Sequence, residues 1–387
     1  MLMSAPKSEG KNWYDVAGEH MRSLGFSENW TNRAVVAAAL RNGVTVTKSD
    51  TRERVILSYN GRQHWWRDGL SSLNTRLAMR VCKNKDVLSA LLSAEGLPVM
   101  KNQVFSAEDA ERAWAWGSRL DSLVVKPADG TGGASVFTDI KTRHEFDQAF
   151  LTVAAHFGRV LVEEFRAGVE YRFLTVRNRV IAVAQRKPAH VLGDGRRTIE
   201  QLVDEKNEQR WRAPSHKLLR LGEHERNYLR KQGLTPSTVP ENEERIYLRA
   251  TSNIHTGGDA IDVTSTIDPE YIAAVEAAAR AIPGGVILGF DILIPEAADD
   301  ERIGIIEINT GPMISMHHLP WEGECRDVGE AIVQAMYSDL REGRDLDDWV
   351  EPFKASARAS EDLRPPIGKV RRKIRRAIGQ IVGAYKR

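Results

Sequence analysis

Apolar and polar positions in the first 80 residues alternate with two different periods. The stretch "TNRAVVAAALRNG" has apolar residues at helical spacing, and it predicts a helix with Thr31 as its N-cap and Gly43 as its stop. The stretches "VTVTKS" and "RERVILSYNGRQHWW" alternate with a period of two, and Asn60-Gly61 between apolar runs is a strong hairpin signal. Residues 1–80 are therefore predicted to form a small N-terminal α/β unit.

Strand and helix patterns then follow one another up to about residue 345. A strand, a glycine-rich loop and a second strand are expected in "SLVVKPADGTGGASVF", and a helix in "TRHEFDQAFLTVAAHFG". Several strands with tight turns follow, which favours antiparallel or mixed sheets and an α/β (α+β) fold class. We divide this part, residues 81–345, into three segments, which are 120–200, a polar insertion or lid at 205–245, and 246–345.

The composition is that of an ordinary globular protein, because 42% of the residues are hydrophobic and 28% are charged. No run of eighteen apolar residues predicts a membrane-spanning helix, and the first residues lack the apolar core of a signal peptide. Cys82 and Cys325 are the only cysteines, so neither a disulfide framework nor a structural zinc site is expected. A reducing, cytoplasmic location is the expected one.

Residues 346–387 are expected to form a linker and a basic tail. Residues 363–387 contain nine Lys or Arg and no acid. The whole chain has a net charge of +2, so the residues outside this segment carry a net charge of −7. Apolar residues recur there every three or four positions, which predicts an amphipathic basic helix. Such a helix suits an anionic membrane surface or an acidic partner, and the alternative is a solvated or self-docked terminus. No base-reading module accompanies it, so nucleic acid is not an expected partner.

The loop in "VVKPADGTGG" carries groups that can bind phosphate. Its glycines, Gly130, Gly132 and Gly133, let backbone amides approach an anion closely, and Lys126 adds a positive charge. The pattern is neither a Walker loop nor GxGxxG, so a hairpin turn with a solvated lysine is an equal alternative.

Two glutamates flank the next predicted turn. Glu163 and Glu170 lie seven residues apart on either side of Ala167-Gly168. A carboxylate at such a turn can hold ribose hydroxyls, and the strand can offer backbone groups to the edge of a base. Taken alone, a solvated hairpin explains this stretch better.

Polar ligands also interrupt two apolar strands near the end of the chain. Glu307 and Asn309 in "IIEIN" share one face of a strand because they are two positions apart, and Asp291 in "GFDILI" can face them from the neighbouring strand. Two carboxylates and an amide oxygen are hard ligands that suit Mg²⁺ and its bound phosphates. The alternative is an outer sheet face with solvated acids.

The order of these features resembles that of ATP-grasp carboxylate–amine ligases. The resemblance runs from Lys85 to Tyr337 and is strongest for the ATP-grasp part of cyanophycin synthetases and of bifunctional glutathione synthetases. The stretches that carry it are "AHVLGDGRRTIEQLV", "EKNEQR", "NIHTGGDAIDVT" and "EINTGPMISMHHLPWEG". It implies an ATP-grasp fold, in which two α+β subdomains clasp ATP, with a nucleotide clasp at 120–200 and a metal-binding subdomain at 246–345.

The resemblance also implies roles for individual residues. For ATP these are Lys85, Lys126, Gly130, Gly132, Gly133, Glu163, Glu164, Phe165 and Glu170, with Phe165 acting through its backbone. For Mg²⁺, as two ions, they are Asp291, Glu307 and Asn309. For catalysis they are Lys126, Arg249, Asn253 and Gly311. For substrate binding we add Arg172, Arg186, Asn309 and His317, whose alternatives are surface arginines and a structural histidine.

The implied reaction joins a carboxylate, from an amino acid or a peptide, to an amine through an acyl phosphate, and it releases ADP and phosphate. The Mur-ligase-like and glutamate–cysteine ligase domains of the resembling enzymes are not expected here, so we expect one addition rather than polymerisation. A homodimer is common in the resembling families. The rival interpretations are a kinase-like phosphoryl transfer and a non-catalytic nucleotide-binding scaffold that acts through the basic tail.

Overall fold

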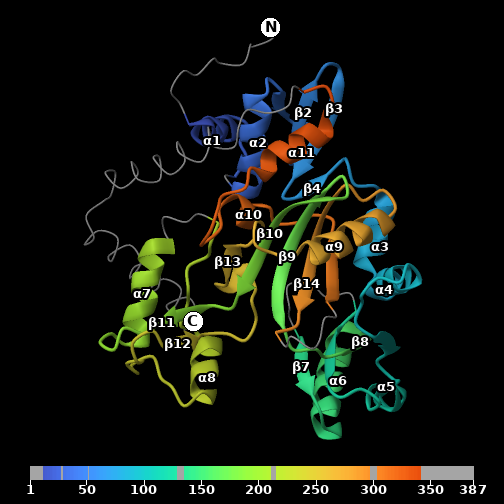
Figure 1. Ribbon diagram of the computed structural model, residues 1–387, viewed down its shortest axis with the longest axis vertical. Helices are drawn as coiled ribbons and strands as arrows, with labels where there is room; N and C mark the ends of the chain where they lie inside the picture. Colours follow the sequence, from blue (N-terminus) through green and yellow to red (C-terminus); the bar gives the residue numbers. More distant parts are fainter. Residues whose placement is uncertain are drawn as a thin grey trace, which may run out of the picture. The chain divides into compact units, whose positions relative to one another are not determined.

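The computed structural model describes residues 12–27, 29–50, 52–128, 135–210, 215–296 and 303–340. The chain divides into two compact units, Met1–Glu342 and Gly343–Arg387. The second unit, with the predicted basic helix, lies outside the described residues, as do Gly130, Gly132 and Gly133 of the predicted phosphate loop. The described residues of the first unit form three antiparallel sheets of four or five strands and one two-stranded sheet, with helices packed against them (Figure 1).

The N-terminal part begins with two helices, α1 (Trp13–Ser23) and α2 (Trp30–Arg41). Its antiparallel sheet follows the order β1-β2-β3-β4, with β1 at Thr45–Lys48, β2 at Val55–Tyr59, β3 at Arg62–Arg67 and β4 at Leu70–Ser71. The hairpin predicted at Asn60-Gly61 is present, and both residues have the positive φ that its turn requires.

The predicted start of α2 was wrong by two residues. The N-cap is Asn29, whose side chain accepts a hydrogen bond from the Asn32 backbone N–H, and Thr31 lies inside the first turn. Asparagine caps helices at least as well as threonine, and Asn29 immediately precedes the first helical residue, Trp30.

The second sheet follows the order β5-β8-β6-β7. It is preceded by the helices α3 (Arg76–Lys83) and α4 (Lys85–Ala94). Its strands are β5 (Asn102–Ser106), β6 (Leu123–Pro127), β7 (Phe137–Ile140) and β8 (Arg159–Glu164). The helices α5 (Ala110–Gly117) and α6 (Arg143–Phe157) pack their apolar side chains on one face of this sheet. The other face carries Lys126 and Glu163.

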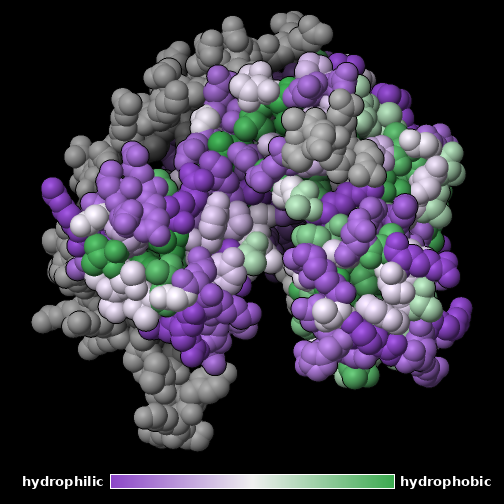
Figure 2. Space-filling model, turned by 60° about the horizontal axis from the view of Figure 1, so that its bottom comes forward, coloured by the Kyte–Doolittle hydropathy of each residue, from purple (hydrophilic) through white to green (hydrophobic). Residues whose placement is uncertain are grey.

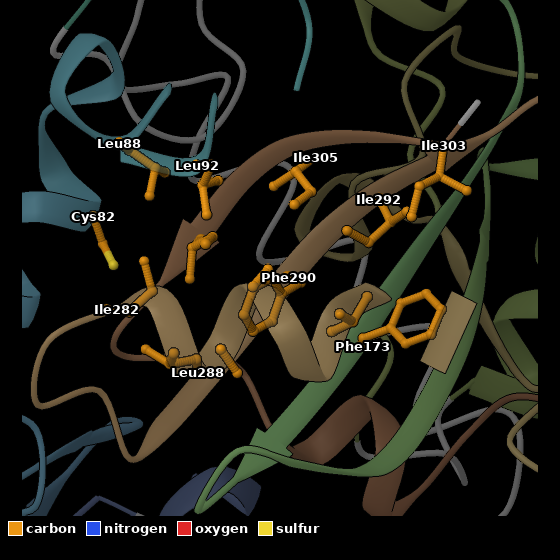
Figure 3. Close-up of a cluster of buried hydrophobic side chains, with 14 of the residues drawn as sticks. Cys82, Leu88, Leu92, Phe173, Ile282, Leu288, Phe290, Ile292, Ile303 and Ile305 are labelled. Atoms are coloured by element: carbon orange, nitrogen blue, oxygen red, sulfur yellow. The ribbon is translucent and has the colours of Figure 1, made fainter. Parts of the chain in front are cut away.

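The five-stranded sheet follows the order β13-β10-β9-β14-β15. Its strands are β9 (Val169–Val176), β10 (Arg179–Lys187), β13 (Asp259–Asp262), β14 (Ile287–Ile294) and β15 (Gly304–Asn309). Helix α9 (Pro269–Ala281) covers one face and completes the core in Figure 3, which includes the fully buried Phe173 and Phe290. The opposite face is the polar one.

A smaller part with its own apolar core is inserted between β10 and β13. It contains α7 (Ile199–Arg210), α8 (Glu223–Lys231) and the two-stranded sheet of β11 (His190–Leu192) and β12 (Arg245–Tyr247). The insertion or lid was expected at 205–245, but the inserted part also includes β11 and the start of α7, and we call residues 189–248 the lid. Three short elements complete the first unit, the 3₁₀ helix η1 (Ile254–Thr256), α10 (Ser315–His318) and α11 (Val328–Met336), which packs on α2.

The face of the molecule in Figure 2 is mostly hydrophilic, with hydrophobic side chains in small separate groups. The exposed large apolar side chains of the described residues are similarly scattered, from Leu77 on α3 to Leu151 on α6 and Leu192 on β11. Single exposed apolar residues are normal on a protein surface and do not by themselves mark a binding face. Among the described residues, no helix has both the length and the hydropathy needed to cross a membrane.

Replacing Phe290 by Ala tests the core that supports the polar face. Phe290 of β14 is 0% exposed and shares a core cluster with Phe173 of β9 and with side chains of α9, so its loss leaves a cavity. We expect the free energy of unfolding to fall by about 3–5 kcal/mol. The control is Leu151→Ala at a side chain that is 63% exposed, which should change it by less than about 0.5 kcal/mol in the same urea titration. Equal effects of the two changes would contradict the assignment of this core.

Candidate functional site

One face of the five-stranded sheet carries a row of charged side chains. In the register of the strands, Asp291 of β14 lies opposite Arg172 of β9 on one side and Glu307 of β15 on the other. Residues directly opposite one another in an antiparallel sheet point to the same face, so all three do. The alternate residues Phe173, Phe290 and Ile308 point to the core. The acids of the two apolar strands therefore face one another across the sheet.

Arg172 and Asp291 form a buried, two-armed ion pair. The guanidinium Nε contacts one carboxylate oxygen and Nη2 donates to the other at 2.9 Å, and both residues are buried. Burial alone would raise the pKa of Asp291, but Arg172 and then Arg186 lower it overall, so the carboxylate is ionised. Arg172 is therefore held by Asp291 and is not the surface arginine of the alternative interpretation, and its role toward a substrate carboxylate stays a prediction.

Arg186 lies on the same face and connects two acids. Its Nη2 contacts Glu170 and lies 3.4 Å from Asp291 Oδ2. Ser252 also donates a hydrogen bond to Glu170, which was expected to hold a ribose. The Nε of Arg186 is buried and has no hydrogen-bond partner among the described residues. Arg186 therefore keeps a donor that a ligand can use.

Glu307 and Asn309 complete the row at its edge. Asn309 Nδ2 donates to Glu307 Oε1 at 2.8 Å, and both side chains are half-buried. In the part of the chain that the structure describes, Glu307 has no ion-pair partner, whereas Asp291 has two. No group of three or more His, Cys, Asp and Glu gathers in the described residues. The donor set of two carboxylates and an amide oxygen fits a hard cation such as Mg²⁺.

His317 lies on α10, which packs on β10 and β13. Its side chain is 2% exposed, and neither ring nitrogen has a hydrogen-bond partner among the described residues. Burial, and then the nearby Arg172, lowers the pKa of His317 to about 3, so the ring is neutral at neutral pH. A neutral ring can donate through one nitrogen and accept through the other. This is consistent with the predicted role in orienting a substrate.

The predicted nucleotide residues lie on the second sheet and next to it. Lys126 of β6 and Glu163 of β8 form a buried ion pair with 2.5 Å between Nζ and Oε1. Glu164 accepts from Arg166, and the backbone N–H of Phe165 donates to the Ser122 carbonyl. That N–H is therefore occupied, which leaves the Phe165 carbonyl as the backbone group for an adenine edge.

Lys85 is the first residue of α4 and is half-buried. Lys85 and Lys126 both remain predictions as phosphate ligands.

Arg249 follows β12 at the edge of the lid. Its Nε and Nη2 lie 2.6 and 2.5 Å from Glu225 Oε1, and Glu225 is a buried residue of α8. Asn253 accepts a hydrogen bond from the His255 backbone N–H and so caps η1. The sequence did not indicate Glu225 as the partner of Arg249, because Glu225 lies in α8 and Arg249 lies beyond the end of β12, 24 residues later.

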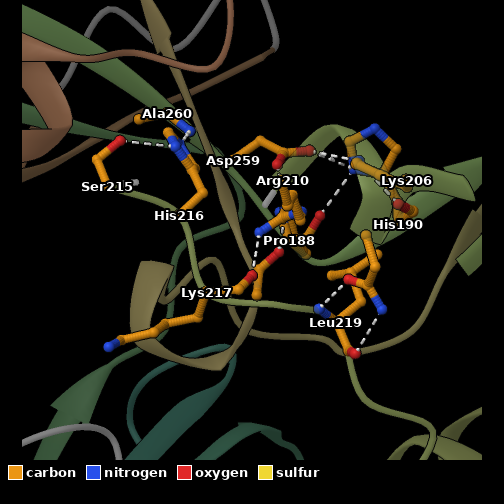
Figure 4. A network of polar contacts seen from close by, with 12 residues as sticks. Pro188, His190, Lys206, Arg210, Ser215, His216, Lys217, Leu219, Asp259 and Ala260 are labelled. Atoms are coloured by element: carbon orange, nitrogen blue, oxygen red, sulfur yellow. Dashed lines mark hydrogen bonds and ion pairs between the residues drawn. The ribbon is translucent and has the colours of Figure 1, made fainter. Parts of the chain in front are cut away.

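A second buried network joins the lid to the five-stranded sheet (Figure 4). Lys206 and Arg210 of α7 converge on Asp259 of β13, which is 0% exposed, and Lys206 Nζ lies 2.6 Å from Asp259 Oδ2. Arg210 also donates to the Gly257 and Lys217 carbonyls. The sequence contained these residues in "EKNEQR" and "TGGDAIDV", but their spacing gave no sign that they meet.

This network predicts a loss of stability in mild acid. Burial, and then Lys206, lowers the pKa of His190 from 6.5 to about 4. Between these values the unfolded chain binds a proton that the folded chain does not, so stability falls as the pH drops from 6.5 to 4. The slope contributed by His190 is at most about 1.4 kcal/mol per pH unit. Urea titrations at pH 6.5, 5.5 and 4.5 should therefore show a shallower decline for His190→Gln than for the wild type, and parallel declines would contradict the assignment.

Comparison with known proteins adds the family context. No protein-family model matches the chain. The glutathione biosynthesis bifunctional protein GshAB of Clostridium perfringens is 32% identical over 319 residues, which are 80% of this chain and 41% of that protein. Cyanophycin synthetase of Trichormus variabilis is 30% identical over 322 residues, 81% of this chain and 36% of that protein. The chain thus spans less than half the length of these relatives.

A similar solved structure comes from the same kind of protein. The crystal structure of a bifunctional glutathione synthetase from Pasteurella multocida superimposes with a TM-score of 0.61 at 26% sequence identity, over 80% of this chain and 43% of that one. The observed sheets are antiparallel and mixed with helices, so the predicted fold class is confirmed. The chain therefore has homologues and structural neighbours among the ATP-grasp ligases, and it shares their fold.

Proposed function

We propose that this chain is an ATP-dependent ligase that forms an amide bond between a carboxylate and an amine and releases ADP and phosphate. The observation that carries the proposal is the charged row of Arg172, Asp291 and Glu307, with Asn309 beside it, on the face of the sheet opposite its apolar core. Within the described residues, Glu307 is the acid of this row without an ion-pair partner, and a bound cation would offset its charge. The relatives, a glutathione biosynthesis protein and a cyanophycin synthetase, support the same chemistry.

Asp291, Glu307 and Asn309 would hold Mg²⁺. A Mg²⁺ ion held there would supply positive charge to offset that of the phosphoryl group. Arg172 keeps Asp291 ionised and correctly oriented, because its two-armed contact fixes the carboxylate. Lys126 supplies a positive charge toward the phosphates, and Glu163 holds that lysine in place.

The carboxylate substrate is a weak electrophile until one of its oxygens takes the γ-phosphoryl group of ATP. The products of this step are an acyl phosphate and ADP, and the amine then attacks the acyl carbon, loses a proton and displaces phosphate. Arg186 and His317 are the residues that we assign to the substrate carboxylate end, because both keep buried polar atoms without partners among the described residues. Arg249, which Glu225 orients, stabilises the charge that develops during these steps. The lid excludes water from the acyl phosphate.

ADP release tests the proposal. Purified protein with Mg²⁺ and ATP is screened over amino acids and dipeptides, with hydroxylamine as a surrogate amine and Lys126→Ala as the inactive control. ADP that depends on the acid, together with a trapped hydroxamate, would establish acyl-phosphate chemistry and identify the acid. ADP with a stable phosphorylated product and no hydroxamate would instead show phosphoryl transfer alone. Nucleotide binding with no ADP for any acid would count against a ligase for these substrates.

A further inference from the structure

Asn74, in the segment between β4 and α3, holds the ends of two strands of the charged row together. Its Oδ1 accepts from the Val286 and Ile287 backbone N–H groups at 2.7 and 2.9 Å. Its Nδ2 donates to the Ile287 carbonyl at 2.7 Å and to the Thr310 carbonyl at 2.9 Å. The side chain is 5% exposed, and all four hydrogen-bonding positions of its amide are used. The Asn74 side chain therefore makes the backbone hydrogen bonds that a neighbouring strand would otherwise make.

The Asn74 side chain, which we call the clamp, lies directly beside the predicted metal ligands. The register between β14 and β15 has Gly289 opposite Asn309 at its end, and Thr310 is the next residue. Beyond that pair the two strands separate, and the Asn74 amide bridges Ile287 to Thr310. The direction in which the chain leaves Asn309 is thus fixed by a residue of another part of the protein.

The turn at Gly69 lies against the loop that follows Asn309. Gly69 has φ +91, and a Cβ added there would lie 2.4 Å from the Pro312 carbonyl oxygen and 2.8 Å from the Gly311 carbonyl carbon. A Cβ added at Gly289 would lie 2.7 Å from Pro312 Cβ. The turn at Gly69 therefore packs against the loop at Gly311 and Pro312, and this loop packs against the sheet at Gly289. These contacts lie on the face of the sheet that carries Arg172.

The turn itself is held by α2. The Asp68 backbone N–H donates to Asn32 Oδ1 at 2.8 Å, and Asn32 Nδ2 donates to Asp68 Oδ1 at 2.9 Å. Leu70 follows and lies against Gly311, where an added Cβ would come within 2.8 Å of Leu70 Cδ2. A continuous set of contacts thus runs from α2 to the loop after Asn309.

We infer that Asn74 and Gly69 are positioning residues, through which the N-terminal part fixes the 310–312 loop over the charged row. This inference rests on the proposed function, since that loop lies between the metal ligand Asn309 and the substrate residue His317. A loop displaced by the steric conflict at Gly69 would move Asn309 away from Glu307. Misplacement of about 1 Å at a reacting centre can lower the rate about 100-fold.

A pair of glycine variants tests the inference. Gly69→Ala and Gly61→Ala both place alanine at positive φ, +91 and +73, so they share the backbone strain. Only Gly69 contacts the loop, because a Cβ at Gly61 has nothing within 4 Å. The first measurement is Mn²⁺ binding in the presence of ADP, followed by the EPR signal of free Mn²⁺. We expect Gly69→Ala to weaken Mn²⁺ binding by about 10-fold or more, and Gly61→Ala to leave it within about 2-fold of the wild type.

Leu70→Ala is the milder variant if Gly69→Ala does not fold, because it removes the contact on Gly311 without a new clash. It should also weaken Mn²⁺ binding, at a temperature where circular dichroism shows the protein folded. Equal Mn²⁺ affinities for the Gly69, Leu70 and Gly61 variants would overturn the positioning role. The two proposals can fail separately. If Gly69→Ala selectively lost Mn²⁺ affinity but the wild type released no ADP with any acid, the positioning role would be supported and the ligase rejected.

Discussion

Glu307→Gln should lower ADP release by at least about 100-fold while the protein stays folded. Glu307 is half-buried at the edge of the charged row, and its neighbour Asn309 donates to it at 2.8 Å. Glutamine keeps the size of the side chain and removes its charge. Asp291 already has Arg172 as a counter-ion, so Glu307 is the carboxylate whose charge is left for a cation. Its loss should therefore reduce metal affinity more than stability.

The measurement has two parts. Mn²⁺ binding in the presence of ADP reports the site itself, and ADP release with the identified acid reports the reaction. Glu208→Gln, on the exposed side of α7, is the control that removes one negative charge elsewhere on the protein. Wild-type Mn²⁺ affinity in Glu307→Gln would reject the metal assignment of this carboxylate. Weakened Mn²⁺ binding in both variants would indicate a general effect of net charge, which added salt would reduce.

The parts of the site that the sequence predicted well depend on local rules. Asp291, Glu307 and Asn309 share one face because alternation along a strand is fixed at two residues. The hairpin at Asn60-Gly61, outside the site, also follows from backbone preferences of single residues, and it is present.

The parts that the sequence did not predict depend on how distant segments pair. Nothing in the sequence indicated that the register of β9 with β14 places Arg172 opposite Asp291, and its substrate role stays a prediction. Glu225 meets Arg249 only because α8 folds back on the end of β12. Asn74 is 212 residues from Val286, and nothing in its neighbourhood in the sequence marks it as a clamp. Register and tertiary contacts of this kind have no local signature.

Lys126→Met should both destabilise the protein and weaken nucleotide binding. The Lys126 and Glu163 side chains are 7% and 8% exposed, so the change leaves a buried carboxylate without its counter-ion. Removing one partner of a buried ion pair costs about 3–5 kcal/mol. The control is Lys141→Met, which breaks a pair with Asp139 on the surface, where the lysine side chain is 62% exposed. That loss should be about 1 kcal/mol or less.

A double variant separates the structural role of Lys126 from its role toward ATP. Lys126→Met with Glu163→Gln removes the unpaired charge together with the lysine, so it should recover most of the lost free energy of unfolding in urea titrations. Because the positive charge toward the phosphates is still missing, ADP affinity measured by calorimetry should stay at the level of Lys126→Met. If the double variant regained ADP affinity along with stability, Lys126 would act only by neutralising Glu163, and the phosphate-binding role implied by the ATP-grasp resemblance would have to pass to Lys85.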